Sequence, residues 1–379
     1  MTRKIIFWSS VDAAMFLRAT VDSIRKSGMD AEHRSAISSD FYRNASTSWR
    51  RFFLRFRMYI EYPIRLAWAC LIDREPRIYI VTTNTFFSPL IALFFSRHHQ
   101  PVIHLVWDLY PDALVESGNN TGYDWIIKRI ESVVQKIFSG AAANIFIGHR
   151  LLEHAKSRYS EVPRAHIIPV GADAGVFSDS PPLLIEKNIP INILYCGNLG
   201  SMHDTLTLVN ALKSPMAYSE QRFGFILHFH ASGPHYAAFI REVQEINSVL
   251  AKNIILKFAL NEAEWTDRMK DAHVALVTMK LGSEKVVMPS KTYSALAAGQ
   301  AILAICSSDS DLARLVMEEE CGWVVTPGNT TELWGALTEI TQNHKLLQTK
   351  RENAYRAGQN KFSEVIVARE WIKLLTSLK

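Results

Sequence analysis

A lysine and two hydroxyl groups stand at the start of a short, otherwise apolar segment in the second half of the chain. The segment is VVMPSKTYSALAAG, in which Pro289 suits the first turn of a helix and Gly299 its end. We therefore expect a helix of about ten residues with Ser290, Lys291 and Thr292 in its first turn. The free N–H groups and the dipole of such a turn favour an anion. The segment predicts either an anion site at Lys291 or a lysine that extends into solvent.

Two glycine-containing loops end apolar runs in the same half of the chain. GNLG, at residues 197–200, precedes a helical pattern, and ASGP, at residues 231–234, ends the next apolar run. Glycines there let the backbone approach a ligand closely or support a tight turn. Neither the G-x-G-x-x-G of dinucleotide folds nor the G-x-x-x-x-G-K-S/T of P-loops occurs, which disfavours dehydrogenases and ATPases. The two loops and the lysine-bearing helix start together predict a diphosphate site.

Size and composition suit two globular domains. The 379 residues exceed one ordinary domain, and 48% hydrophobic against 21% charged residues provide material for two cores. The four cysteines lie far apart without a C-x-x-C pair, so we expect thiols in a reducing compartment rather than zinc or redox chemistry. A net charge of +5 is too small to indicate nucleic-acid binding by itself.

Arginines and aromatic rings are interleaved between residues 49 and 68. The arginines are Arg50, Arg51, Arg55, Arg57 and Arg65, among Trp49, Phe52, Phe53, Phe56, Tyr59, Tyr62 and Trp68. The pattern indicates either an interfacial helix on anionic lipid or a partly buried helix with a basic edge. The N-terminal MTRKIIFWSS lacks the features of a secretory signal, and no apolar run is long enough to span a membrane. We expect a cytoplasmic protein.

Apolar runs alternate with helical stretches, which predicts an α/β fold with parallel sheets. The runs expected as strands are 4–8, 78–83, 101–107, 144–148, 191–200, 224–233, 253–259, 274–279, 301–306 and 322–325. Prolines in DSPPLLIEKNIPI mark a linker between two such sheets. The predicted divisions are an N-terminal acceptor-binding domain (1–175), a linker (176–190), a nucleotide-sugar-binding domain (191–358) and a C-terminal helix (359–379) that packs back on the first domain.

Loops at the carboxyl ends of parallel strands are where such sheets bind ligands. The glycine loops, KLGSEKVVMPSK and, in the first half, WDLYPD all fall at such ends. We expect them to converge on one crevice. Asp108 of WDLYPD is either a base that orients or deprotonates an acceptor hydroxyl or a turn or cap aspartate before Pro111.

Five segments of the second half, in order, are LYCGNLG, FHASGP, DAHVALVTM, MPSKTYSALAAGQAILAI and CGWVVTPGNTTEL. They resemble the nucleotide-binding domain of glycosyltransferase family 4, which has the GT-B fold, over roughly residues 191–340. The likeness is greatest to bacterial enzymes of colanic acid, O-antigen and capsule synthesis, with their GNLG and PSK-x-Y motifs. WDLYPDALVESG and IIPVGADAGVF are similar to family segments of the first half. The resemblance implies two Rossmann-like domains facing a central cleft.

Some family positions differ in this chain. The arginine and lysine of the family's G-R-L-x-x-x-K-G loop align with Asn198 and His203, so we expect Lys291 to restore a cation at the diphosphate. Ser294 stands where the family has the second glutamate of its E-x7-E pair, and Glu284 lies two residues before the position of the first. WSSVDAAMF replaces the N-terminal glycine-rich loop.

The resemblance implies a retaining, metal-independent transfer of a hexosyl or N-acetylhexosaminyl group. The donor is a UDP-sugar, with no further cofactor, and the acceptor is a lipid-linked saccharide at the inner face of the cell membrane. The catalytic candidates are Asp108, Lys291 and Glu284. The donor-site candidates are Gly197, Asn198, Leu199, Gly200, His203, Ser232, Gly233, Pro289, Ser290, Thr292 and Ser294. The membrane candidates are Arg50, Arg51, Arg55 and Arg57.

Two other readings of the same fold stay open. One is a nucleotide-sugar epimerase, which needs no acceptor. The other is a catalytically weak scaffold that binds a partner, which the missing glutamates would suit. The DSD sequence at 309–311 follows an apolar run and is explained by a helix cap, so we predict no metal site.

Overall fold

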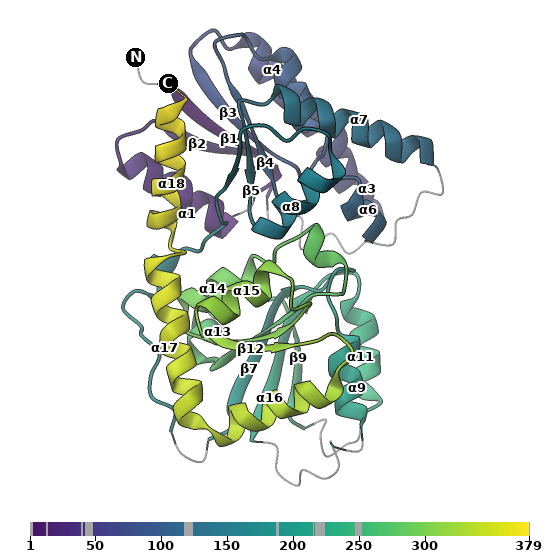
Figure 1. Cartoon of the computed structure of the whole chain (residues 1–379), viewed down its shortest axis with the longest axis vertical. Coiled ribbons are helices and arrows are strands. Elements are labelled where there is room, and N and C mark those ends of the chain that lie inside the picture. Colours follow the sequence, from purple (N-terminus) through teal and green to yellow (C-terminus); the bar gives the residue numbers. More distant parts are fainter. Residues whose placement is uncertain are drawn as a thin grey trace. The chain divides into compact units, whose positions relative to one another are not determined.

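The computed structural model of the chain describes residues 3–12, 14–38, 41, 48–116, 124–186, 189–214, 216, 224–246 and 252–378. It divides into two compact units (Figure 1). Unit 1 comprises Met1–Val170, Lys285–Met288 and Glu364–Lys379, and unit 2 comprises Gly171–Glu284 and Pro289–Ser363. Each unit has its own sheet of parallel strands with helices between them, which confirms the predicted fold class.

Unit 1 is built on a six-stranded sheet in the order β2-β1-β3-β4-β5-β6. Its strands are β1 (Lys4–Val11), β2 (Ala31–Ile37), β3 (Arg77–Thr82), β4 (Val102–Val106), β5 (Ala143–Phe146) and β6 (Ala165–Ile167). Its helices are α1 (Ala14–Lys26), α3 (Ser48–Phe56), the π-helix η1 (Arg57–Glu61), α4 (Tyr62–Ile72), α5 (Ser88–Phe95), α6 (Asp112–Glu116), α7 (Asp124–Gly140), α8 (His149–Arg158) and α18 (Glu364–Ser377).

Alternate residues of β1 pack on opposite faces of this sheet. On one face the Trp8 ring lies 6.2 Å from the ring of Tyr62 in α4, and on the other the Phe7 ring lies 5.3 Å from that of Trp371 in α18. All four rings are buried. Helices therefore cover both faces, as a parallel sheet requires.

The sequence AEHRSAI does not show the apolar run of a strand, yet it forms β2 at the edge of the sheet. An edge strand has one free side, where charged side chains are tolerated and discourage pairing with other chains. Its Glu32 is ion-paired with Lys4 of the neighbouring β1 at 2.9 Å. The prediction missed β2 for this reason, and missed β6 because it has only three residues.

Unit 2 has a six-stranded parallel sheet in the order β12-β11-β10-β7-β8-β9. Its strands are β7 (Ile191–Asn198), β8 (Phe225–Ser232), β9 (Ile254–Phe258), β10 (Val274–Thr278), β11 (Ala301–Ile305) and β12 (Gly322–Val325). Its helices are η2 (Ala174–Phe177), α9 (Leu206–Lys213), α11 (Tyr236–Gln244), α13 (Glu262–Asp271), η3 (Ser283–Lys285, at the unit boundary), α14 (Lys291–Ala297), α15 (Asp311–Glu318), α16 (Thr330–Gln342) and α17 (His344–Asn360).

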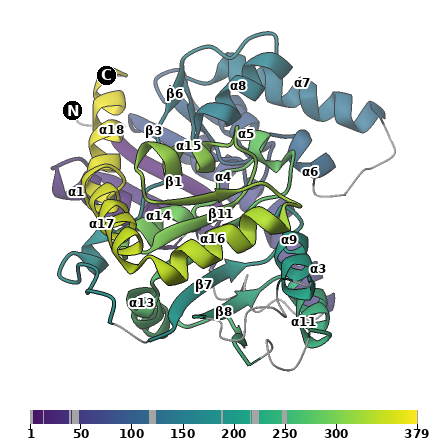
Figure 2. The ribbon, with the colours of Figure 1, turned by 60° about the horizontal axis from the view of Figure 1, so that its bottom comes forward.

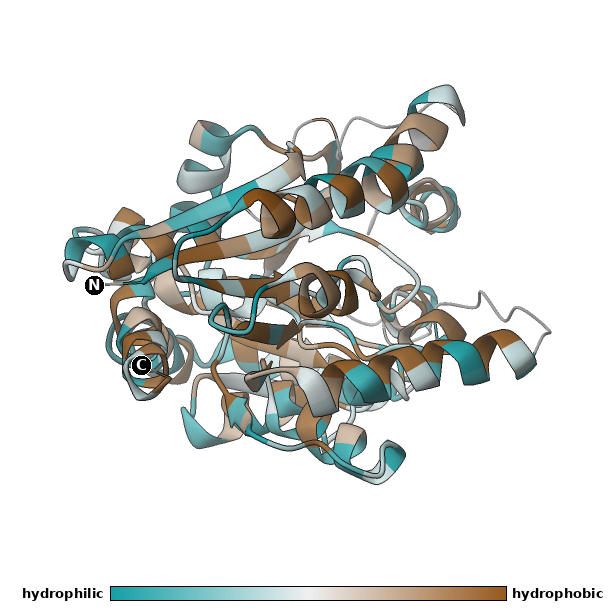
Figure 3. Ribbon diagram, turned by 90° about the horizontal axis from the view of Figure 1, so that it is seen from above, coloured by the Kyte–Doolittle hydropathy of each residue, from teal (hydrophilic) through white to brown (hydrophobic). Residues whose placement is uncertain are grey.

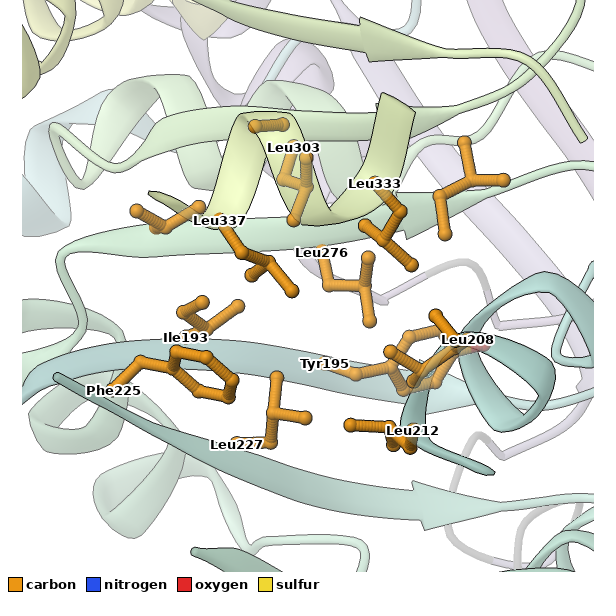
Figure 4. Close-up of a cluster of buried hydrophobic side chains, with 14 of the residues drawn as sticks. Ile193, Tyr195, Leu208, Leu212, Phe225, Leu227, Leu276, Leu303, Leu333 and Leu337 are labelled. Carbon is orange, nitrogen blue, oxygen red and sulfur yellow. The ribbon is translucent and has the colours of Figure 1, made fainter. Parts of the chain in front are cut away.

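A hydrophobic core of unit 2 lies between its sheet and helices α9, α11 and α16. Figure 2 shows α16 crossing the sheet on this side, and Figure 4 shows side chains of the helices and strands meeting in the cluster. Tyr195 of β7 points into it beside Ile193, and its ring stacks on Phe229 at 5.5 Å. The ring of Tyr195 is therefore fixed by packing.

Capping residues set several helix ends in unit 2. Asn261 and Glu264 form a capping box at the start of α13, and the Ser310 hydroxyl accepts from the Ala313 N–H at 3.0 Å at the start of α15. Ser310 is thus the cap expected in DSD. Hydrophobic and hydrophilic bands lie beside each other along the helices (Figure 3), as expected where one side of a helix faces a core.

Candidate functional site

A doubly wound sheet binds ligands beyond the carboxyl ends of its strands, where neighbouring connections leave in opposite directions. In unit 2 this place lies between β7 and β10. The loops that follow these two strands contact each other, because the Lys280 N–H after β10 donates to the Met202 carbonyl after β7 at 2.9 Å. The structure thus brings GNLG and the start of KLGSEK together.

The two predicted glycine loops also lie side by side. The Leu199 N–H donates to the Ser232 carbonyl at 2.7 Å, and the His235 N–H donates to the Leu199 carbonyl at 3.2 Å. Gly233 has φ +111°, and a Cβ added there would lie 2.3 Å from Asn198 Oδ1 and 2.7 Å from the Leu199 carbonyl oxygen. No larger residue fits without displacing the loop, so this close approach requires glycine.

Lys291 folds back against the end of β7. Its ammonium donates to the Tyr195 hydroxyl at 2.7 Å, lies 3.2 Å from His203 Nε2, and stands 3.9 Å from the centroid of the Tyr195 ring. Burial lowers the pKa of Lys291 to about 7. The side chain is half-buried at the glycine loop, so the alternative of a lysine that simply extends into solvent is wrong.

His203 links Lys291 to the glycine loop. Its Nδ1 lies 3.1 Å from the Gly200 amide nitrogen and 3.2 Å from the Gly200 carbonyl oxygen. Burial lowers the pKa of His203 to about 3, and the neighbouring charge of Lys291 adds to this effect. The imidazole is therefore neutral at physiological pH, so Lys291 is the residue of this pair that can carry a positive charge there.

The other predicted donor-site residues of unit 2 have different surroundings. Ser290 is exposed and its hydroxyl makes no capping bond, while Pro289 and Ser294 are half-buried. Thr292 is fully buried, so its hydroxyl does not reach the surface of the loops. Helix α14 has seven residues and begins at Lys291, so it is shorter than predicted.

Glu284 is almost fully buried after β10. Its Oε2 accepts the N–H of Gly282 at 2.8 Å, and Gly282 has φ +92°. The carboxylate thus stabilises a tight turn of the loop. Glu284 therefore has a local structural role in this loop, and its catalytic role stays a prediction.

Asp108 follows β4 in unit 1. Its N–H and that of Trp107 both donate to Thr83 Oγ1, at 3.1 and 3.0 Å. Burial raises the pKa of Asp108 to about 6. The other aspartate of WDLYPD, Asp112, starts α6 and pairs with His154 Nε2 at 3.1 Å. Asp112, and not Asp108, therefore lies in the first turn of α6.

Three polar residues were missed in the sequence, Tyr195 in unit 2 and Thr83 and Asp12 in unit 1. Tyr195 was counted only as part of a strand, and Thr83 only as the end of one. Asp12, just after β1, is ion-paired with Arg18 and is almost fully buried. Asp12 lies within WSSVDAAMF, and its position at a strand end was the signal that could have found it.

Residues 48–72 form the consecutive helices α3, η1 and α4. Arg50 and Arg55 are exposed there, whereas Arg57 is ion-paired with Glu61 at 2.7 Å and donates to the Ala36 carbonyl. The exposed large hydrophobic side chains are Trp49, Phe52, Phe53, Phe56, Tyr59, Ile60, Ile64, Trp68, Leu71 and Ile72. We call these ten side chains with Arg50 and Arg55 the aromatic surface. The side chain of Arg51 lies outside the described part of the structure.

The described residues were compared with the requirements of a membrane-spanning helix and of a metal site. None of the helices in the described ranges is both long and apolar enough to cross a membrane. No group of three His, Cys, Asp or Glu side chains among the same residues is arranged to hold a metal ion. The four cysteines are thiols, with Cys196 half-buried and the other three buried.

The two doubly wound units define the GT-B fold, since solved GT-B glycosyltransferases resemble the chain over almost its whole length. Sucrose-phosphate synthase from Thermosynechococcus elongatus is similar with a TM-score of 0.71 at 14% identity, covering 99% of both chains. HepE from Anabaena, solved in complex with UDP, is similar with a TM-score of 0.66 at 12% identity, covering 99% of this chain and 100% of that chain. At these identities the likeness shows the fold alone.

A sequence relative points to an activity. The chain is 33% identical over 256 residues to a probable glycosyltransferase, WbjE, of Pseudomonas aeruginosa. The match covers 63% of this chain and 59% of that protein, so it spans less than two thirds of the relative's length. No family model matches the chain.

Proposed function

We propose that this protein is a retaining glycosyltransferase that moves a sugar from a UDP donor to a lipid-linked saccharide in bacterial surface polysaccharide synthesis. The observation that carries the proposal is the cluster of unit 2. There a half-buried lysine without a carboxylate partner among the described residues stands beside two abutting glycine loops. A cation and close backbone N–H groups are what a diphosphate requires.

The similar proteins support this choice of donor and reaction. The WbjE relative is called a probable glycosyltransferase, and the similar Anabaena structure holds UDP. In unit 2 the carboxyl end of β7 is also the place where doubly wound sheets hold nucleotides. We therefore place the donor diphosphate at Lys291 and the loops at 197–200 and 231–234.

Lys291 would act mainly in the transition state. Negative charge accumulates on the departing UDP as the bond to the sugar breaks, and a fixed ammonium in a low-dielectric site stabilises that charge. Asp108 of unit 1 would orient the acceptor hydroxyl or remove its proton. Its raised pKa of about 6 suits this task, because the carboxylate is ionised at neutral pH and still basic.

The aromatic surface supports the proposal that the acceptor is linked to a lipid. Aromatic rings favour the headgroup layer of a bilayer, and arginines favour anionic lipid. Trp49 and Phe52 are 74% and 60% exposed, which would be unfavourable in water unless they had a partner. We propose that this surface holds the protein on the cytoplasmic face of the membrane, where the lipid-linked acceptor is located.

Transfer from a panel of UDP-hexoses and UDP-N-acetylhexosamines to undecaprenyl-diphosphate-linked saccharides tests the proposal. We expect one donor to give a product that is extended by one sugar and retains the anomeric configuration. UDP at 100 times its Kd should stabilise the protein by about 2.7 kcal/mol in thermal unfolding. Stabilisation by ADP or GDP but not by UDP would contradict the donor assignment, and turnover without acceptor would favour an epimerase.

A further inference from the structure

The ring of His203 lies between the Lys291 amine and the backbone of Gly200. The position of the hydrogen on the ring decides which of these groups it can donate to and which it can accept from. Its Nε2 faces Lys291 Nζ at 3.2 Å, while its Nδ1 faces both the N–H and the carbonyl oxygen of Gly200, at 3.1 and 3.2 Å. A neutral imidazole carries one hydrogen, on either nitrogen. An unprotonated Nδ1 accepts the Gly200 N–H, whereas a protonated Nδ1 donates to the Gly200 carbonyl.

Two of the possible arrangements pair both ring nitrogens and differ in the charge of Lys291. In the first, Nδ1 accepts the Gly200 N–H, and Nε2–H donates to a neutral Lys291 amine. In the second, Nδ1–H donates to the Gly200 carbonyl, the Lys291 ammonium donates to Nε2, and the Gly200 N–H is free. The second arrangement holds one more proton than the first and has the opposite histidine tautomer.

We propose that the donor diphosphate selects the second arrangement, so that its binding takes up one proton and releases the Gly200 N–H toward a phosphate oxygen. The Nε2 proton of His203 passes to the Lys291 amine, and Nδ1 takes up a proton from the buffered solvent. His203 stays neutral and the charge of the cluster rises by one. Both changes favour an anion, because a cation and a free N–H donor appear together. This inference rests on the proposed UDP site.

The surroundings of Lys291 suit such a change. The Tyr195 hydroxyl accepts from Nζ at 2.7 Å and donates to the Asn198 carbonyl at 2.9 Å, and it can do so in either arrangement. Among the described residues, the titratable groups that act on Lys291 or His203 are Tyr195, Cys196, His235 and Lys280. None of them is a carboxylate that would fix the ammonium permanently. Burial lowers the pKa of Lys291 to about 7, so both arrangements are populated near neutral pH.

Calorimetry of UDP binding in two buffers with different ionisation enthalpies measures the proton uptake. At pH 8 the terminal phosphate of UDP, with a second pKa of about 6, is already ionised and does not contribute. Because burial lowers the pKa of Lys291 to about 7, much of its amine is neutral at pH 8 in the free protein, so we expect UDP binding to take up a large fraction of one proton. The Kd for UDP should then rise about tenfold for each pH unit above 7, until the pKa of the bound state is reached.

Two variants test whether Lys291 is the group whose titration causes the proton uptake. Lys291→Met keeps the length of the side chain and removes the titrating group, so it should bind UDP more weakly and abolish the uptake. Lys270→Met, at an exposed lysine of α13, should retain the full uptake. Equal uptake in the Lys291→Met protein would overturn the inference.

Nitrogen-15 NMR of the histidine rings in the unsubstituted protein at pH 8 tests the tautomer directly. The His203 signal, assigned with His203→Gln, should change from the Nε2–H to the Nδ1–H pattern as UDP is added. An unchanged tautomer, or UDP binding with less than about 0.2 proton taken up, would overturn this inference and leave the proposed function intact. Failure of UDP to bind at all would overturn both.

Discussion

The two units share a parallel sheet but differ at the carboxyl ends of their strands. In unit 2 this edge carries glycines with positive φ, at Gly197 and Gly233, and the cation Lys291. In unit 1 it carries two aspartates, Asp12 and Asp108, and no described glycine with positive φ follows β1, β3 or β4. The edge of unit 2 thus presents a cation and the edge of unit 1 presents carboxylates, so two sheets of the same kind differ in the charge that they carry at the same edge.

The same difference predicts opposite responses to pH. Burial raises the pKa of Asp108 to about 6 and lowers that of Lys291 to about 7. In the reaction that we propose, the active forms are the ionised carboxylate and the ammonium, so we expect activity to be lost as pH falls through 6 and as it rises through 7. We expect a bell-shaped profile of kcat/KM, whose acid limb belongs to unit 1 and whose alkaline limb belongs to unit 2.

Asp108→Asn should have the largest effect. The amide keeps the shape but cannot accept a proton, so turnover should fall about a thousandfold while the Kd for UDP stays unchanged. The acid limb of the pH profile should disappear in the residual activity. Asp112→Asn, in the same loop, is the matched control and should retain turnover. Full activity of the Asp108→Asn protein would assign Asp108 to the turn. It would also contradict the proposal that unit 1 orients or deprotonates the acceptor hydroxyl.

Lys291→Ala should reduce kcat/KM about a hundredfold, equivalent to about 3 kcal/mol, because one preorganised contact to the leaving group is lost. Unlike the Asp108 variant, it should also weaken UDP binding. Lys291→Arg keeps the charge but should restore activity only in part, since the wider guanidinium does not fit between Tyr195 and His203. Steady-state kinetics and UDP titrations of the Lys291→Ala and Lys291→Arg proteins check these expectations. Unchanged kinetics of Lys291→Ala would mean that Lys291 does not bind the diphosphate and that backbone N–H groups and His203 bind it instead.

Much of the fold could be predicted because buried parallel strands are apolar runs with abrupt ends. All of the expected runs form strands, whereas the charged edge strand β2 gave no such signal. The glycine loops could be located for the same reason, as they follow two of these runs. The contacts of Lys291 could not be predicted, because Tyr195 and His203 are 96 and 88 residues away from it in sequence. Thr292 shows the converse: it is adjacent to Lys291 in sequence, yet the helix turns it into the core.

Reversing the exposed arginines of the aromatic surface should affect only membrane attachment. Each basic residue near an anionic bilayer is worth about 1 kcal/mol, so Arg50→Glu with Arg55→Glu should weaken vesicle binding at least about thirtyfold. UDP binding by unit 2 should be unchanged. The control is Lys345→Glu with Arg356→Glu, two exposed positions of α17 in unit 2. Flotation with vesicles containing anionic lipid measures the effect. Equal flotation of all three proteins would show that helices α3 to α4 only complete the fold.

The smallest of these effects concerns the contact between the two glycine loops. In Gly233→Ala the new Cβ would meet Asn198 Oδ1 and the Leu199 carbonyl, so GNLG must move away from β8. Positive φ alone also destabilises alanine, by about 1 kcal/mol. Gly28→Ala separates the two causes, because Gly28 has φ +90° in unit 1 with no atom within 4 Å of the added Cβ. Both variants should unfold at lower temperature, but only Gly233→Ala should weaken UDP binding, by about tenfold, or 1.4 kcal/mol. Equal UDP affinity in the two variants would mean that the spacing of the loops does not position the diphosphate, and the difference between the units would then rest on Lys291 alone.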